Sequence, residues 1–228
     1  MASLKIMRRA ITLLALCLTF AAAMAQAEDA TLNGEAEVTG KAERGARFAF
    51  GGGRCGAIGY SEWRDGAGVA IAREELIYDG AAWRRYRLQR MTVAQDVEAT
   101  REGGFIHLDI RDGERRRKVR LEVEGEVLAG PTLITHLQAQ LRDLRRGRPL
   151  ELQYLVAEQA MVLGLRATST GYGAGGLTNV RLEASSALLR PFVPTTLITF
   201  DDEGRFVGMQ GRLCLKGSAG SHWTVSSE

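Results

Sequence analysis

Tight-turn dipeptides recur through the first half of the chain and divide it into short segments. The pairs concerned are Asp65-Gly66, Asp79-Gly80, Gly103-Gly104 and Asp112-Gly113. Such pairs suit two-residue connections between antiparallel strands, because these turns need residues that tolerate a positive φ. The pattern therefore predicts an antiparallel meander that runs from residue 47 to residue 127.

The segments between these turns alternate between apolar and polar side chains. In one of them, Ile106, Leu108 and Ile110 fall on one face of an extended chain. His107 and Asp109 fall on the opposite face. We therefore expect a sheet with one buried face and one solvated face.

A different period appears in "GPTLITHLQAQLRDLRRGRP", residues 130 to 149. The leucines of this stretch recur at helical spacing, at Leu133, Leu137, Leu141 and Leu144. Pro131 is tolerated in a first helical turn, and Gly147 followed by Pro149 ends the pattern. The stretch predicts one amphipathic helix over about residues 131–146.

Alternating segments resume at residue 150 and continue to a last hairpin that turns at Glu203-Gly204. The tail from about residue 217 lacks this pattern, and we expect it to be flexible. Together the segments predict a mainly β protein, a curved antiparallel sheet or open barrel of roughly 10–12 strands that wraps the single helix. No linker divides residues 28–228, so we expect one domain.

Residues 1–27 have the three parts of a secretory signal peptide. A basic start precedes an apolar run over residues 10–23, and small residues allow a cut after Ala25 or Ala27. The apolar run is shorter than the ~20 residues of a membrane-spanning helix, which disfavours a retained anchor. We therefore expect a periplasmic or secreted protein with no transmembrane span in its mature form.

The chain has three cysteines, of which Cys17 lies in the expected signal peptide. Lipidation of Cys17 is disfavoured because Leu16, directly before it, is bulky. Cys55 and Cys214 would remain in a compartment that oxidises thiols, and we expect them to form one disulfide. Two unpaired buried thiols are the alternative.

The charge balance argues against a nucleic-acid partner. The full chain has 30 Lys and Arg residues against 27 Asp and Glu residues. Lys5, Arg8 and Arg9 precede the expected cut and no acidic residue does, so the mature chain keeps 27 of each sign. A net charge near zero provides no general attraction to phosphate backbones.

The stretch "FAFGGGRCGAIGY", residues 48 to 60, contains the spacing G-x-G-x-x-G at Gly51, Gly53 and Gly56. A dinucleotide site needs these glycines to open a helix whose N-terminus faces the pyrophosphate. Here the following residues are typical of a strand instead. We therefore expect no nucleotide cofactor, and we interpret the glycines as a tight connection near Cys55.

The histidines and acidic residues form no recognisable catalytic or metal motif. His107, His136 and His222 have no metal-ligand spacing, and no Gly-x-Ser-x-Gly elbow is present. We expect no metal, no cofactor and no enzymatic activity. His107 with Asp109 is the best pair for a hydrolase assembled from scattered residues, although an exposed surface pair is the simpler interpretation.

The basic run "ERRRKVR", residues 114 to 120, follows a predicted turn. Pairing across that turn places Ile110 opposite Arg115, and the outward positions carry the other cations of the run. Arg115 and Arg117 then fall on the apolar side near the tip. They either extend to water along their hydrocarbon stems or form a basic rim suited to an anionic headgroup. The run lacks the interleaved aromatic residues of a nucleic-acid site.

Three stretches carry a resemblance to known proteins: "AREELIYDGAAWRRYRL", "GPTLITHLQAQLRDLRRGRPLELQYLV" and "LEASSALLRPFVPTTLITFDDEGRFVGMQG". Together they resemble an uncharacterised family of secreted proteobacterial proteins. More loosely, they are similar to the periplasmic half-barrel proteins that include lipoprotein carriers of the Lol type. This resemblance covers most of the mature chain. It implies an open sheet around a helix, with an apolar interior able to hold acyl chains.

Three hypotheses about function follow. The first is an exported, non-enzymatic protein that binds or carries a hydrophobic or lipidic molecule in a half-barrel. The second is a structural or interaction module of the cell envelope that binds a protein partner. The third is an envelope hydrolase that uses His107 and Asp109.

Overall fold

The computed structural model describes residues 34–39, 46–51, 58–80, 82–172, 176–212 and 222–227. The expected signal peptide at 1–27 lies outside the described residues, as do Cys55 and Cys214. The predictions of a cleavable leader and of a disulfide therefore stay predictions. The described residues include no helix that is both long and apolar enough to cross a bilayer.

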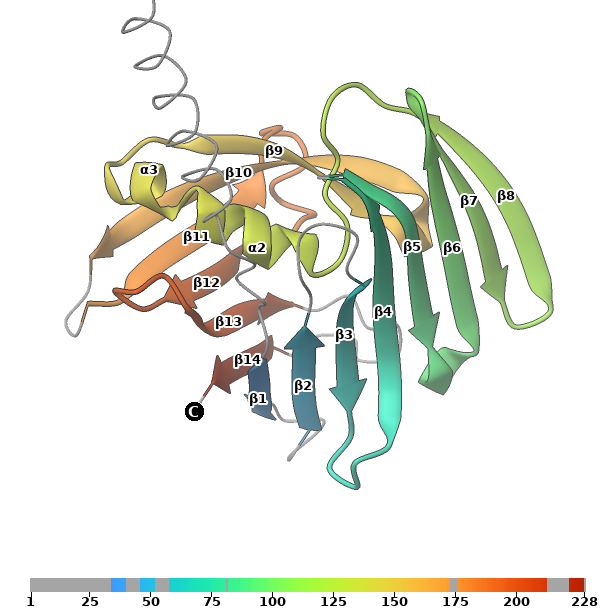
Figure 1. Ribbon diagram of the computed structural model, residues 1–228, viewed down its shortest axis with the longest axis horizontal. Helices are drawn as coiled ribbons and strands as arrows, with labels where there is room; N and C mark the ends of the chain where they lie inside the picture. Colours follow the sequence, from blue (N-terminus) through green and yellow to red (C-terminus); the bar gives the residue numbers. More distant parts are fainter. Residues whose placement is uncertain are drawn as a thin grey trace, which may run out of the picture. The chain divides into compact units, whose positions relative to one another are not determined.

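The described residues form fourteen strands, two short α-helices and two 3₁₀ turns (Figure 1). The strands of the first half are β1 (Gly34–Thr39), β2 (Ala46–Gly51), β3 (Ile58–Arg64), β4 (Ala70–Asp79), β5 (Ala82–Arg90), β6 (Gln95–Glu102), β7 (Phe105–Asp112) and β8 (Arg115–Glu122). Those of the second half are β9 (Leu150–Val156), β10 (Met161–Tyr172), β11 (Thr178–Ala184), β12 (Thr196–Phe200), β13 (Phe206–Arg212) and β14 (His222–Ser227). The helices are α2 (Thr132–Ala139) and α3 (Leu141–Arg145), and the 3₁₀ turns are η1 (Met91–Val93) and η2 (Ala157–Gln159).

All fourteen strands belong to one antiparallel sheet made of two meanders. The order across the sheet is β8-β7-β6-β5-β4-β3-β2-β1-β14-β13-β12-β11-β10-β9. The first meander runs from β1 outward to β8, and the second runs inward from β9 to β14. The two meanders meet where β14 pairs with both β1 and β13. The sheet is open, with β8 and β9 at its two ends.

The mainly β architecture expected from the sequence is confirmed, with more strands than the roughly 10–12 expected. One extra strand is β14, which lies in the segment that we expected to be a flexible tail. The segment lacks a clear alternation of apolar and polar residues, yet it pairs on both sides within the sheet. Pairing on both sides satisfies its backbone whatever its side chains are.

The single helix expected over residues 131–146 is interrupted at Gln140. The backbone of Gln140 has φ −97° and ψ 3°, and its N–H donates to the carbonyl oxygens of His136 and Leu137. The leucine stripe nevertheless continues across the break, since Leu137, Leu141 and Leu144 are all buried. Gly147 ends the segment at φ +77°, as the sequence predicts.

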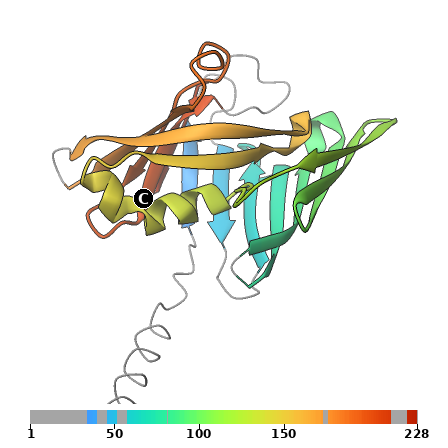
Figure 2. The same ribbon diagram turned by 90° about the horizontal axis from the view of Figure 1, so that it is seen from above.

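The helices cover the inner face of the second meander (Figures 1 and 2). Leu137, Leu141 and Leu144 belong there to one cluster with side chains from β9 to β13, which also includes Trp63, Ile71 and Ala72 of β3 and β4. The strand residues of this cluster include Leu152, Leu163, Leu165, Val180, Leu182, Ile198 and Phe200. We call this cluster the helix-covered core.

The inner face of the first meander is covered in a different way. Its apolar residues on β4 to β7 pack against the chain that leaves β8 and against the tip of the β9–β10 hairpin. The covering residues are Val123, Val127, Ala129, Leu155 and Ala157. We call this cluster the loop-covered core. Trp83 anchors it, because its indole N–H donates to the carbonyl oxygen of Val127 at 2.6 Å.

The two end strands are protected from further pairing in different ways. At the β9 edge, the N–H of Leu128 donates to Gln153 O at 2.8 Å, and the N–H of Leu155 donates back to Leu128 O at 2.8 Å. At the other edge, six of the eight residues of β8 are exposed and most of them are cationic. Charged side chains along an edge strand oppose edge-to-edge association. The basic run of the sequence is thus explained by the place of β8 in the sheet.

Candidate functional site

A pocket of about 430 Å³ opens between the two helices and the turn that joins β12 to β13. Its lining residues are Gln138, Ala139, Leu141, Arg142, Arg145, Arg146, Glu203 and Gly204. Leu141 belongs to the leucine stripe, so the pocket borders the helix-covered core. The pocket therefore combines an apolar base with three arginines from α3 and the residue that follows it.

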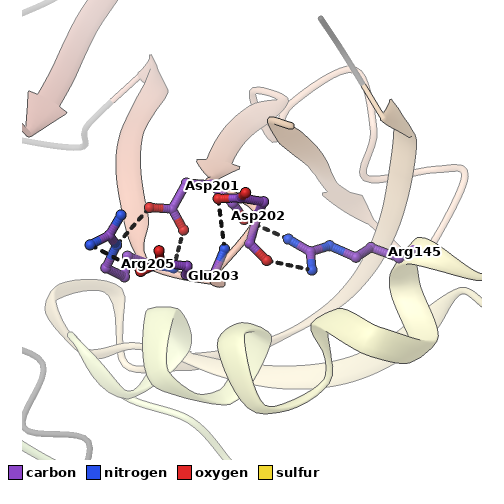
Figure 3. A network of polar contacts seen from close by, with 5 residues as sticks. All are labelled: Arg145, Asp201, Asp202, Glu203 and Arg205. Carbon is purple, nitrogen blue, oxygen red and sulfur yellow. Dashed lines mark hydrogen bonds and ion pairs between the residues drawn. The ribbon is translucent and has the colours of Figure 1, made fainter. Parts of the chain in front are cut away.

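Arg145 fastens the pocket wall to the β12–β13 turn (Figure 3). Its Nε donates to the Thr178 hydroxyl at 2.9 Å, and its Nη1 donates to Asp202 O at 3.1 Å. Its Nη2 donates to Asp201 O. Because Thr178 is fully buried, this guanidinium is held in one position between α3, β11 and the turn. Arg145 is therefore a structural cation that fixes the shape of the pocket.

The β12–β13 turn is itself stabilised by an ion pair. The Asp201 carboxylate accepts hydrogen bonds from the Arg205 backbone N–H and Nε, each at 2.7 Å (Figure 3). Desolvation acts to raise the pKa of Asp201, but the hydrogen bonds from Arg205 lower it below its usual value. Gly204 completes the turn with φ +83°, where other residues are strained. The turn thus forms a rigid wall.

The mouth of the pocket is basic. Arg142 and Arg146 are exposed there, and Arg146 lies 3.7 Å from the Asp143 carboxylate. On the opposite wall, Glu203 lies 3.1 Å from the Arg205 guanidinium. Both acids are already paired with arginines, Asp143 with Arg146 and Arg148 and Glu203 with Arg205, and arginines outnumber acids in the pocket lining. Arginine guanidinium groups suit carboxylate or phosphate oxygens.

A second polar cluster lies on the inner face of the first meander. The Ser61 hydroxyl donates to Glu74 Oε2 at 2.5 Å, and the Tyr86 hydroxyl donates to Glu74 Oε1 at 2.6 Å. Ser61 and Tyr86 are both buried. Desolvation by burial is the main cause that raises the pKa of Glu74 above its usual value. It also raises the pKa of Tyr86 well above its usual value.

A buried ion pair lies close to this carboxyl group. Arg90 Nη2 is 3.1 Å from Glu158 Oε1, and Arg90 Nη1 donates to Gln95 Oε1 at 3.4 Å. The charges of Glu158 and Arg90 both act on the pKa of Glu74, in opposite directions. Glu158 lies in η2, so this pair joins the first meander to the tip of the β9–β10 hairpin. The cluster holds the two meanders together around an interior carboxyl group.

The two arginines expected to form a basic rim lie on β8. Ile110 is paired with Arg117, two positions from the expected partner, so the expected side of the sheet is kept. Arg117 Nη2 donates to Glu158 O at 3.0 Å, which places this side chain on the hairpin tip. Arg115 is exposed and pairs across the sheet with Asp112. The 430 Å³ pocket is lined by other arginines.

The histidine candidates are separated from one another. His107 is exposed on β7, and the neighbouring Asp109 carboxylate accepts from Arg116 Nε at 2.8 Å. This hydrogen bond lowers the pKa of Asp109. His136 Nδ1 lies 3.9 Å from the carboxylate of Glu126. Among the residues whose surroundings the structure describes, no group of three His, Cys, Asp or Glu residues could hold a metal ion.

Sequence reasoning missed both polar clusters. The signal for Glu74 is in the sequence: it lies at alternate spacing between Ala72 and Leu76, which are buried on the inner face of β4. A carboxyl group at an inward position points to a buried polar network. The pocket arginines have no such signal, because their grouping depends on the β12–β13 turn, which is distant in sequence.

Fold and site together define a mainly β protein with an open, barrel-like sheet, in which one pocket borders the helix-covered core. No protein-family model matches the chain, and no curated protein matches it. The structure is similar to the crystal structure of a β-barrel-like protein of domain of unknown function DUF1849 from Brucella abortus. The TM-score is 0.56 at 6% identity, and the match covers 86% of this chain and 94% of that chain. This likeness shows the fold.

Proposed function

We propose that the protein is exported to the periplasm and binds an amphipathic molecule with an anionic headgroup, without catalysing a reaction. The observation that carries the proposal is the pocket at α2 and α3. Its volume of about 430 Å³ lies within the range typical of small-molecule sites. Its arginines suit the headgroup, and its apolar base suits the first part of a hydrocarbon chain.

The division of roles among the arginines supports this proposal. Arg145 is engaged with the backbone of the β12–β13 turn, whereas Arg142 and Arg146 are exposed at the mouth. An anionic headgroup would accept hydrogen bonds from Arg142 and Arg146. The attached apolar chain would lie on Leu141, next to the helix-covered core. The proposal thus moves the basic rim expected at Arg115 and Arg117 to another part of the molecule.

The proposal is tested by ligand binding to the protein purified from the periplasm. A fluorescent long-chain fatty acid is titrated into the protein and into the double variant R142Q/R146Q. Loss of charge-assisted hydrogen bonds is expected to weaken binding by at least about tenfold. The matched control is R85Q/R166Q, which removes two exposed arginines that lie outside the pocket lining. Equal affinities in both variants would overturn the assignment of this pocket.

A mass spectrum of the same preparation tests export and the disulfide. The denatured mass shows whether the chain begins after Ala25 or after Ala27. Its change on reduction shows whether Cys55 and Cys214 are joined. The native mass shows whether a lipid-sized molecule is bound. A full-length mass would contradict export with cleavage, and an apo protein that binds no fatty acid would favour the envelope interaction module.

A further inference from the structure

The connection between β11 and β12, residues 185–195, exposes large apolar side chains. Leu188 is 83% exposed and Phe192 is 81% exposed, and Leu189 is also exposed. This connection projects beyond the strands that it joins (Figure 2). Single exposed apolar residues are common, but two nearly fully exposed ones four positions apart on one loop are a candidate contact surface.

The loop is held in shape by its own backbone. The N–H groups of Leu189 and Arg190 donate to Ser186 O at 3.1 and 3.2 Å. Those of Phe192 and Val193 donate to Leu189 O at 2.9 and 3.0 Å. Val193 also packs against the helix-covered core, which anchors the base of the loop. The apolar side chains are therefore presented by a rigid turn.

These same hydrogen bonds prepare the loop for an apolar environment. A backbone N–H that enters hydrocarbon without a partner is costly, because no water is there to satisfy it. Four N–H groups of this loop already have partners within it, and Pro191 and Pro194 have no N–H group to satisfy. The N–H groups of Ser186, Ala187 and Leu188 have no backbone partner within the loop, so the loop is suited to shallow insertion only.

The loop itself carries one positive charge, and the acidic Glu151 contacts only its base, where it accepts from the Ser185 hydroxyl at 2.5 Å. No acidic residue occurs from Ala184 to Phe200, and Arg190 is the single charged residue in that stretch. The Nε of Arg190 donates to Ala184 O at 3.2 Å, which holds the guanidinium beside the loop. A cation next to exposed apolar residues matches a bilayer whose headgroups carry phosphate and net negative charge.

We propose that residues 186–193 form a membrane-contact loop, which inserts Leu188 and Phe192 among the acyl chains of an anionic lipid surface. Arg190 contacts the headgroup phosphates. The loop would insert only a few side chains. A fluid bilayer can take them up without having a preformed cavity of matching shape. Its binding is weak and reversible, since one small apolar insertion is far short of a membrane anchor.

The test is flotation of the purified protein with vesicles of phosphatidylcholine that contain about one third phosphatidylglycerol. The test variant is L188S/F192S. The matched control is V69S/M91S, which replaces two apolar residues that are 61% and 45% exposed elsewhere on the molecule. We expect wild type and control to float alike and the loop variant to bind at least about tenfold more weakly. Thermal unfolding should be the same for all three proteins, because the replaced side chains are exposed.

Three results would overturn the proposal: no flotation of the wild type, equal binding by the loop variant, or equal binding to pure phosphatidylcholine. If the wild type does not float, the exposed loop would be interpreted as a contact surface for a protein partner instead. The pocket variant R142Q/R146Q separates this proposal from the proposed ligand site. It should float like the wild type, because the pocket and the loop lie at opposite ends of β12.

Discussion

The inner faces of the two meanders are covered by different kinds of chain segment. The helix-covered core is closed by a leucine stripe that runs along α2 and α3. The loop-covered core is closed by an irregular chain segment and a hairpin tip, and it borders the Glu74 cluster and the Arg90–Glu158 pair. The two short helices bring backbone groups to the core that are largely satisfied within the helices themselves. The irregular segments over the loop-covered core have no such regular internal hydrogen bonding. Polar side chains and the hydrogen bond from Trp83 fix their position instead. Cavity effects should therefore dominate in the helix-covered core, and conformational and pH effects in the loop-covered core.

The largest expected effect is in the helix-covered core. Phe200 is fully buried and meets Phe206 edge-to-face, with ring centroids 6.4 Å apart. Phe200→Ala should lower the free energy of unfolding by about 3–5 kcal/mol, because it leaves a cavity that apolar neighbours cannot fill. Chemical denaturation measures this loss. Phe192→Ala, at an exposed phenylalanine, is the control and should change stability little; similar losses for both would contradict the assignment of this core.

The next effect concerns the close approach of the covering chain in the other half. Gly130 has φ +50°, and a Cβ there would lie 2.9 Å from Tyr86 Cε2 and 3.1 Å from Glu74 Oε1. Gly130→Ala should therefore combine backbone strain with a clash and cost about 2–4 kcal/mol.

Gly147→Ala is the matched control for this prediction. Gly147 also has a positive φ, +77°, but a Cβ there would meet nothing within 4 Å. Only backbone strain of about 1 kcal/mol is expected. The difference between the two variants, measured by thermal and urea unfolding, isolates the contact with the Glu74 cluster. Equal losses would show that the irregular segment is not tightly packed.

A smaller effect should appear as a change in pH dependence. The folded pKa of Glu74 is raised by burial, so the folded protein holds this proton to a higher pH than the unfolded chain does. The resulting stabilisation is complete below the unfolded pKa and is lost as the pH rises through the folded pKa. Glu74→Gln removes this titration. Its amide oxygen can accept from one of the two hydroxyl groups, and its amide N–H can donate to the other, whose hydrogen bond then reverses direction. The stability of this variant relative to the wild type should therefore increase with pH. Unfolding curves between about pH 4 and pH 8 test this, and a constant difference would contradict it.

The smallest effect is expected on the solvated face. Asp109→Asn removes the exposed ion pair with Arg116, and solvent screens such pairs strongly. The change in stability should lie within the error of a denaturant titration. The same variant tests the remaining hydrolase hypothesis, because it removes the partner proposed for His107. A loss of any hydrolytic activity in D109N would revive that hypothesis.

The elements that the sequence predicts well are those whose own pattern of apolar and polar side chains indicates which face is buried. The alternation around Ile110 identified the buried face of β7, and the leucine stripe identified the helical segment. The pairing of β7 with β8 was displaced by two positions, because the turn uses Gly113 and Glu114 as its central residues. A shift by two keeps every side chain on its face, so the error left the burial prediction intact.

What the sequence did not predict depends on contacts between distant segments. β14 has no clear alternation, and its place becomes evident only when β1 and β13 are both present. The pocket likewise needs Arg145 of α3 to meet the carbonyl groups of Asp201 and Asp202. No sequence pattern around Arg145 or around the β12–β13 turn indicates that the two segments meet. Glu74 is the exception, since its inward position could have been recognised from its neighbours.

The position of β14 has a consequence for how the chain folds. Ala36 near the start of the sheet pairs with Ser227, so the contact that joins the two meanders connects the first and last strands of the sheet. Contacts between such distant segments form slowly, because closing a long loop costs conformational entropy before the contact can stabilise the fold. Each meander can form from neighbouring hairpins, but they are joined in one sheet only after the last residues are available. This order of events would suit the export that we propose, in which the chain crosses a membrane before it folds.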